Sequence, residues 1–442
     1  MPSLELAKRF DWDTFVRRYW NQRPVLFKGT GASPFTPEDV FEAAAGATRR
    51  YLSRSYAADS RPDVAFTIDR LRQLHVRDWL PRTSDGSLDG YDARLAARLG
   101  ERRYALIVSS LHASSFRLWS RERDFFSELW RRVGIPQTGA ITTLFHGTYE
   151  HSPVGVHLDR FTTFLFALRG RKRMRFWRKR PWRADVSTIL DYQPYLKSSF
   201  VAEVEPGDIL YWPSTYYHVG ESVGAGVASS VNVGIPITEH RTIYSVDDLL
   251  RGMIDETSLA DQEWEQTRLA RVAATPLVRG ALTGVGVLSA ALPRALTEAV
   301  EAFRDVSEPR EARRHIQATW LERLTAGGFE PVPEPGRTRR LKDAHHVRAD
   351  PRFPILFERD GTRRWLCAAN GHALRGAGGG RAVDTFFQRL NSGRAMRVAA
   401  LLRPFRVSHS TAHDPDVIAA SREGMHSLLE KLHTFRAITF TP

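Results

Sequence analysis

Short stretches in which apolar residues dominate or alternate with polar ones recur through the first half of the chain, and they predict β-strands. A strand repeats every two residues, so alternate side chains share one face. The stretches 25–27, 104–109, 138–149, 209–212 and 227–236 follow this pattern. Apolar residues at helical spacing predict helices at 11–20, 36–45, 71–80 and 115–132. The first half is therefore expected to be mainly β, with a few amphipathic helices.

Beyond residue 240 the pattern changes to helical spacing. Helices are expected between residues 242 and 304, and a Pro-rich linker follows at 329–336. Asp360-Gly361 and Asn370-Gly371 predict tight hairpin turns between short strands. Two further helices are expected at 382–393 and 420–435. The last part of the chain is thus predicted to be a mixed module of helices and hairpins.

One charged residue interrupts the apolar face of a predicted strand at 161–176. The apolar rows are Phe164, Phe166 and Leu168 before Gly170, and Met174 and Phe176 after it, whereas the opposite row holds Arg171, Arg173 and Arg175. Lys172 falls on the apolar row. It could extend its ammonium group to solvent at a barrel mouth. Alternatively it points inward toward a bound carboxylate, because an unpaired buried charge costs several kcal/mol.

A His-x-Asp pair, His157 and Asp159, directly precedes this strand. On extended backbone the two side chains point the same way. His218 follows a second strand and turn, 205–213, and could complete two histidines and one carboxylate, the set that holds Fe(II) with open coordination positions. His218 could also be a packed, hydrogen-bonded residue. His146 and His151 are expected to have ordinary packed or surface roles.

Length and composition restrict the number of domains, the cellular compartment and the partners that can be expected for the chain. Its 442 residues favour two or three domains, and a single cysteine, Cys367, excludes an internal disulfide and fits a reducing cytoplasm. No basic-then-apolar pattern stands at the start of the sequence, so export is not expected, and the apolar stretch 280–292 is too short to span a bilayer. The net charge of +14 allows contact with nucleic acid, although only seven of the 64 basic residues are lysines, which also fits a compositional preference for arginine. In the basic stretch 175–183, Trp177 and Trp182 could clamp a substrate, or the stretch could be a solvated loop.

Two segments, GVHLDRFTTFLFALRGRKRMRFW and EPGDILYWPSTYYHVGES, resemble JmjC or cupin-type Fe(II), 2-oxoglutarate-dependent oxygenases, in particular the ribosomal oxygenase branch. The opening FVRRYWNQRPVLFKG is similar as well. The resemblance is good over residues ~10–238 and covers the remainder only in general layout. It implies a mainly β double-stranded β-helix, or jelly-roll barrel, over residues 1–240. A helical segment over 241–306 would either pair two copies or pack as a cap on its own barrel, and an α+β, winged-helix-like domain would occupy 307–442.

The resemblance also implies roles for single residues. His157, Asp159 and His218 would hold Fe(II), and Lys172 stands where the family binds the distal carboxylate of 2-oxoglutarate. Asn232 and Thr163 match positions of polar contacts to the cosubstrate, and either Thr142 or Thr143 could supply a further hydroxyl.

The implied function is hydroxylation of a protein or peptide side chain. The alternatives are a hydroxylase of a free or carrier-linked amino acid or small peptide in a biosynthetic pathway, and a non-catalytic cupin that binds a ligand. The expected partners are a protein substrate and a second copy of the chain, with nucleic acid as an open question and no membrane.

Overall fold

The computed structural model describes residues 4–53, 64–136, 139–149, 151–224, 226–236, 309–361, 363–407 and 417–441. The chain divides into two compact units. The first comprises Met1–Tyr56, Ser60–Glu239 and Glu322–Pro442, and the second Ala57–Asp59 and His240–Leu321. Nearly all of the second unit lies outside the described residues, including the helices predicted between 242 and 304.

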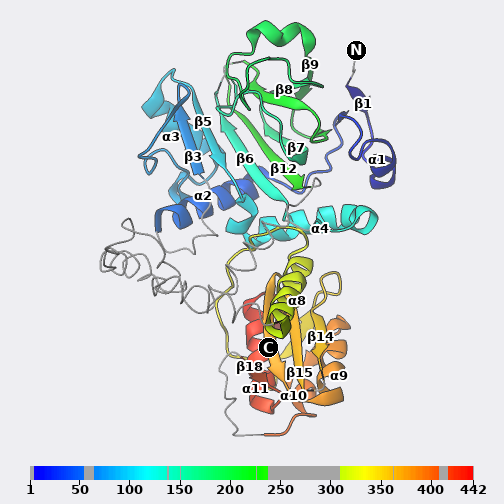
Figure 1. Ribbon diagram of the computed structural model, residues 1–442. Coiled ribbons are helices and arrows are strands. Elements are labelled where there is room, and N and C mark those ends of the chain that lie inside the picture. The colour runs from blue at the N-terminus through cyan, green and yellow to red at the C-terminus, as the bar shows by residue number, and fades with distance from the viewer. Residues whose placement is uncertain are drawn as a thin grey trace, which may run out of the picture. The chain divides into compact units, whose positions relative to one another are not determined.

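A large sheet and a small sheet form a barrel in the first half of the chain (Figure 1). The large sheet runs, in spatial order, through β1 (Glu5–Ala7), β2 (Val25–Phe27), β10 (Ile209–Trp212), β7 (Phe161–Arg169), β12 (Ala228–Pro236), β6 (Ile141–Gly147), β5 (Tyr104–Val108), β3 (Val64–Ile68) and β4 (Leu71–Arg72). The small sheet has the order β11 (Tyr217–Ser222), β8 (Lys172–Trp177) and β9 (Phe200–Val204). The strands predicted near 25, 104, 141, 209 and 228 are therefore confirmed.

Helices cover the outer face of the large sheet. They are α1 (Trp12–Arg18), α2 (Pro37–Ser53), α3 (Leu88–Leu99) and α4 (Phe116–Val133), with 3₁₀ turns at Thr83–Asp85 and Leu111–Ser114. A further 3₁₀ turn, Gln193–Ser198, precedes β9 and packs against the small sheet. Side-chain oxygens of Asp11 and Ser115 cap α1 and α4 at their N-termini. The amphipathic helix predicted at 115–132 is confirmed, and its apolar face packs on the sheet through Trp119 and Phe126. α2 is longer than the predicted 36–45.

The helix predicted at 71–80 is wrong. Leu71 and Arg72 pair with β3, and α3 begins only at Leu88. Leu74, which the helical pattern would bury, is 87% exposed. Strand pairing and a loop that buries Val76 and Leu80 determine this stretch instead of helical propensity.

Both faces of β7 are buried, in two different cores. Phe164, Phe166 and Leu168 face the helices, in a cluster with Phe126. Leu165 and Ala167 face the barrel interior, in a cluster shared with Met174 and Phe176 of β8. The apolar row of β8 is buried as predicted. It faces the barrel interior together with Leu165, and not the helices that Phe164 faces, because the chain reverses at Gly170 between the two sheets.

The C-terminal part combines helices with two small sheets. One sheet has the order β17 (Met396–Arg397), β13 (His346–Ala349) and β19 (Ile438–Thr441), and the other β14 (Leu356–Asp360), β15 (Arg364–Ala369), β16 (His372–Ala377) and β18 (Val417–Ala419). The helices are α8 (Pro309–Ala326), α9 (Gly380–Asn391), α10 (Val398–Leu402) and α11 (Arg422–Thr434). Both predicted hairpins are confirmed, since Asn370 and Gly371 take positive φ between β15 and β16, and Gly361 does so after β14. Among the described helices, none has the length and apolar character needed to cross a membrane.

Candidate metal centre

A loop between β6 and β7 carries the His-x-Asp pair, and two single bridges fix its path. His157 pairs through its backbone with His218, and Val156 pairs with Ile189. Gly155 has φ +74°, and a Cβ there would lie 2.4 Å from the carbonyl oxygen of Ile189. Only glycine fits this position, because both the close approach and the backbone angle exclude a side chain. The loop is therefore held against β11, where the third predicted ligand lies.

The three predicted ligands converge. His157 Nε2 lies 3.4 Å from Asp159 Oδ1, and His218 Nε2 lies 3.3 Å from Asp159 Oδ2. The candidate ligand atoms all lie within 4.8 Å of one another. Nδ1 of His157 is 2.9 Å from the Gly155 carbonyl oxygen, and Nδ1 of His218 is 3.2 Å from that of Tyr216. With the proton on Nδ1 and donated to the carbonyl, the Nε2 lone pairs are free to bind a metal, whereas with the proton on Nε2 each imidazole donates to the Asp159 carboxylate.

The electrostatics of this cluster suit a cation. Burial tends to raise the pKa of Asp159, but hydrogen bonds and charge from the two histidines outweigh it and hold the pKa well below its ordinary value. Burial, together with the charge of His157, lowers the pKa of His218, whereas the hydrogen bond and charge of Asp159 outweigh burial and raise the pKa of His157, so that a bound metal would displace a proton there. An ionised carboxylate and a neutral imidazole are the forms that bind a metal. Two nitrogens and one carboxylate oxygen on one side fit a divalent iron with open coordination positions.

Lys172 lies inside the barrel, 3% exposed. Its Nζ donates to Ser230 Oγ at 2.8 Å and lies 4.5 Å from the centre of the Phe145 ring. No carboxylate pairs with it among the described residues, and burial lowers its pKa to about 7. A Cβ on Gly220 would lie 2.9 Å from Lys172 Cε, so the absence of a side chain there makes room for the lysine. The solvent-directed alternative for this lysine does not hold, and the ammonium group is placed to receive an anion inside the barrel.

The polar residues predicted near the cosubstrate lie on two opposite faces of the large sheet. Thr142 Oγ1 donates to Glu122 Oε1 at 2.5 Å on the helical side of the large sheet. Thr143 is on the opposite parity and pairs with Asn232. The neighbours of Asn232 on β12 and of Thr163 on β7 belong to the core that faces the helices. Because side chains alternate along a strand, Asn232 and Thr163 themselves face the barrel interior. Of the two threonines on β6, Thr143 is thus the one that faces the interior.

Several buried polar atoms of this barrel have no hydrogen-bond partner within the described part of the chain. They are Tyr149 Oη, Trp212 Nε1, Ser222 Oγ and Asn232 Oδ1. Trp212 packs against His218, with ring centres 5.0 Å apart, and the Tyr149 ring lies 5.9 Å from Lys172 Nζ. Ser222 pairs directly with Lys172 across β11 and β8. Buried polar groups are normally satisfied, so these atoms fit a polar ligand or water in the barrel.

Three residues of this site, Ser230, Tyr149 and Gly220, were not predicted from the sequence. Ser230 precedes Asn232 by two residues, so strand alternation applied to β12 could have found it. Gly220 follows His218 by two residues on β11 and faces Lys172. Tyr149 comes after β6, where no periodic pattern applies, and the sequence carries no local signal for it.

The proposed tryptophan clamp is wrong. Trp177 and Trp182 are 1% and 4% exposed, and their indole N–H groups donate to the carbonyl oxygens of Tyr195 and Val186. Both belong to a small apolar cluster outside the barrel, so neither can stack on a substrate.

His146 and His151 have packed roles, as expected. His146 contacts Ser229 Oγ at 2.6 Å and Asp92 Oδ1 at 2.7 Å while fully buried. His151 is buried beside Tyr192.

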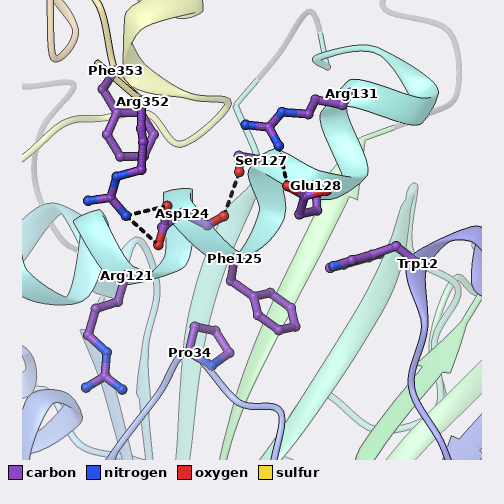
Figure 2. Close-up of a pocket in the computed structure, with 10 residues that line it drawn as sticks. All are labelled: Trp12, Pro34, Arg121, Asp124, Phe125, Ser127, Glu128, Arg131, Arg352 and Phe353. Atoms are coloured by element: carbon purple, nitrogen blue, oxygen red, sulfur yellow. Dashed lines mark hydrogen bonds and ion pairs between the residues drawn. The ribbon is translucent and has the colours of Figure 1, made fainter. Parts of the chain in front are cut away.

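A surface pocket of about 550 Å³ lies along α4, and none of the triad residues lines it (Figure 2). Trp12 and Phe125 line it together with charged side chains that are already paired. Arg352 binds Asp124, Arg131 binds Glu128, and Arg121 binds Asp39. No cluster of metal-ligating groups lines this pocket, so the barrel interior remains the candidate site.

One known family matches the part of the chain that holds this candidate site. Residues 121–240 match the family model of the JmjC domain. The ribosomal protein uL16 3-hydroxylase of Escherichia coli is 24% identical over 240 residues, which are 53% of this chain and 56% of that protein, so the chain spans about half the length of this curated relative. Solved structures of YcfD, a ribosomal oxygenase from E. coli, one of them in complex with cobalt and 2-oxoglutarate, are similar at 17% identity and a TM-score of 0.44, over 98% of this chain and 98–99% of those chains. Residues 121–240, which hold all three converging ligands and Lys172, are therefore similar to the JmjC domain, in a chain that resembles the E. coli uL16 3-hydroxylase over about half of its length.

Proposed function

We propose that this protein is an Fe(II)- and 2-oxoglutarate-dependent hydroxylase of a protein side chain. The observation that carries the proposal is a His-Asp-His triad suited to a metal and a buried lysine that has no carboxylate partner among the described residues, both inside one barrel. A barrel that only bound a ligand would not need both a three-donor set for a cation and a separate cation for an anion. The JmjC match over residues 121–240 supports the same conclusion.

The metal would be held by His157, Asp159 and His218. When bound, iron and 2-oxoglutarate supply the oxidising chemistry, with succinate and CO₂ as coproducts. The protein's part is to hold the donors in place: the Gly155 and Tyr216 carbonyls orient the two imidazoles, and Trp212 packs against His218.

The cosubstrate would lie between the triad and Lys172. His218 pairs with Phe176, and Ser222 pairs with Lys172, so the two sites are four residues apart along one strand pair, or about 13 Å of backbone. Both His218 and Lys172 are on the interior face of this strand pair, where the cosubstrate would lie. Ser230 would share the distal carboxylate with Lys172. Asn232, Thr143 and Thr163 would offer further polar contacts along the barrel wall.

A protein side chain is the proposed substrate because the curated relative acts on ribosomal protein uL16, and that protein is the first candidate. A hydroxylase of a free amino acid or small peptide would use the same triad and lysine. Substrate size separates the two alternatives, since only the first predicts that turnover needs a folded or extended protein partner.

The test is succinate formation by the purified protein with Fe(II) and 2-oxoglutarate. We expect stimulation by uL16 or its peptides, with a mass increase of one oxygen atom in the peptide, and none by free amino acids. Stimulation by free amino acids alone would refute the protein substrate. Absence of metal-dependent 2-oxoglutarate binding would refute the oxygenase itself.

The proposed domain division is a catalytic domain over 1–240, a dimerising helical segment over 241–306 and a winged-helix-like domain over 307–442. The hairpins β14–β15 and β15–β16, packed with α9 and α11, support the last of these as an α+β module. The homodimer and the cytoplasmic location remain predictions.

A further inference from the structure

The C-terminal part of the chain holds most of the excess positive charge. Residues 331–442 are a quarter of the chain and contain 19 Lys and Arg against 10 Asp and Glu, a net charge of +9 out of +14. A compositional preference for arginine would spread the charge evenly along the chain. The concentration in one module calls for a physical explanation, and the strand register shows where part of the charge lies.

The sheet formed by β17, β13 and β19 has one buried and one exposed face. Val347 and Ala349 of β13 are fully buried with Ile438 of β19, in the module's core. The alternate residues are exposed, and register places them in rows: His346 pairs with Arg397 and with Thr441, and Arg348 pairs with Thr439. The exposed face, called the basic face below, consists of His346, Arg348, Arg397, Thr439 and Thr441. It carries hydrogen-bond donors and no carboxylate.

The arginines of the basic face have no ion-pair partner in the described part of the chain. Nearby carboxylates are already engaged: Asp343 binds Arg422, and Asp350 binds Arg352. Arg348 and Arg397 are diagonal neighbours across β13 and β17, so their Cβ atoms are roughly 7–8 Å apart.

The chain enters β13 directly after an exposed basic run. This run consists of Arg337, Arg339, Arg340 and Lys342, which are exposed and also make no ion pair within the described residues. Basic side chains therefore continue from the face into the segment that precedes it.

We propose that the basic face and the basic run bind the phosphate backbone of a nucleic acid. Guanidinium groups without an ion-pair partner and threonine hydroxyls, side by side on one face of a sheet, are suited to neighbouring phosphates. The exposed positions of the face hold no Phe, Tyr or Trp for extended base stacking and no large apolar residue for insertion into a lipid surface. Binding is therefore electrostatic and weakly dependent on sequence, with RNA and DNA as equivalent ligands.

The test is titration of the full-length protein into a fluorescein-labelled 20-nucleotide uridine RNA and a thymidine DNA of the same length, followed by fluorescence anisotropy at several salt concentrations. For single strands each phosphate contact contributes about 0.7 to the slope of log K against log salt. Arg348→Ala with Arg397→Ala should lower the slope by about 1.4 and weaken binding about 25-fold at 0.1 M salt. Both residues are exposed, and a circular dichroism spectrum and unfolding midpoint like those of the wild type establish that the double variant is folded.

The matched control is Arg18→Ala with Arg102→Ala. These exposed arginines pair with Glu5 and Asp69 and lie outside the C-terminal module. The control removes the same net charge and should change affinity less than threefold. An equal loss in both double variants would overturn the basic face, because net charge alone would then explain binding. So would the absence of saturable binding, or equally tight binding of poly-glutamate or phosphatidylglycerol vesicles that is lost in the Arg348/Arg397 variant.

Discussion

Replacement of Lys172 by methionine should make the ligand-free protein more stable and its cosubstrate binding weaker. Lys172 is 3% exposed, and burial lowers its pKa from 10.5 to about 7. The charge therefore disfavours the folded state, by an amount on the order of 5 kcal/mol below pH 7. Because the folded-state pKa is lower than the unfolded one, this cost is fully present below pH 7 and disappears as the pH rises toward 10.5. Methionine keeps the apolar stem and removes the cost.

The same substitution removes the proposed contact to the distal carboxylate. A charge-assisted hydrogen bond contributes roughly 1.5–3 kcal/mol, so the KM for 2-oxoglutarate should rise about tenfold to more than a hundredfold. Lys172→Arg keeps a cation that can bind a carboxylate and should have a smaller effect. Iron binding should be unchanged, because Lys172 is not among the three ligands.

The assays are urea unfolding of the ligand-free protein at pH 7 and pH 9.5, and succinate formation against 2-oxoglutarate concentration. Arg173→Met is the matched control, since Arg173 is on the outward face of the same strand and binds Glu203. The difference in unfolding free energy between wild type and Lys172→Met should shrink from pH 7 to pH 9.5. A KM raised by Arg173→Met and not by Lys172→Met would refute the assignment of the interior face. An unfolding free energy lowered at pH 7 would refute the unpaired buried charge.

Three further predictions concern the triad, the assembly and the basic loop. His157→Ala, Asp159→Ala and His218→Ala should each abolish Fe(II)-dependent succinate formation while the circular dichroism spectrum stays unchanged, and near-wild-type turnover in any one would contradict the metal site. If the 242–304 segment pairs two copies, light scattering at micromolar concentration should give the mass of a dimer, and deletion of the segment should give monomer or aggregate; a monomeric intact chain would count against it. Trp182→Ala should lower the free energy of unfolding by about 3–5 kcal/mol, because Trp182 is buried in a small core. If it raises the KM of the substrate without loss of stability, the tryptophan contacts substrate after all.

The sequence predicted the barrel strands well because alternation is a local signal. The interior position of Lys172 followed from parity on β8, where Met174 and Phe176 are both nearly fully buried. The burial of β7 on both faces was not visible in the sequence. Phe164 and Leu165 are both apolar, so periodicity alone cannot show which of the two cores each residue faces. The helix predicted at 71–80 failed for the opposite reason: its apolar spacing was helical, but pairing of Leu71 with Ile68 formed a strand.

The choice between Thr142 and Thr143 could not be made from the sequence because the register of β6 depends on distant partners. Thr142 lies on the outer face, where its hydroxyl donates a hydrogen bond to Glu122 of α4, twenty residues earlier in the chain. Thr143 faces inward because it pairs with Asn232. Likewise, no local pattern shows that Ser230 lies within reach of Lys172, 58 residues away. Contacts of this kind become visible only when the sheets close around the interior.

The pairing of β8 with β11 determines where the third metal ligand, His218, lies relative to the proposed cosubstrate lysine, Lys172. In that ladder His218 lies opposite Phe176, Gly220 opposite Met174, and Ser222 opposite Lys172. A slip of one residue in either strand would turn its whole inward row outward and expose either His218 or Lys172. The register is held by the tight fit of Lys172 against Gly220 and by the outward pair of Arg175 with Glu221. One strand pair therefore fixes the spacing between the metal and the anion end of the cosubstrate, and the two sites can be expected to fail together when its register is disturbed.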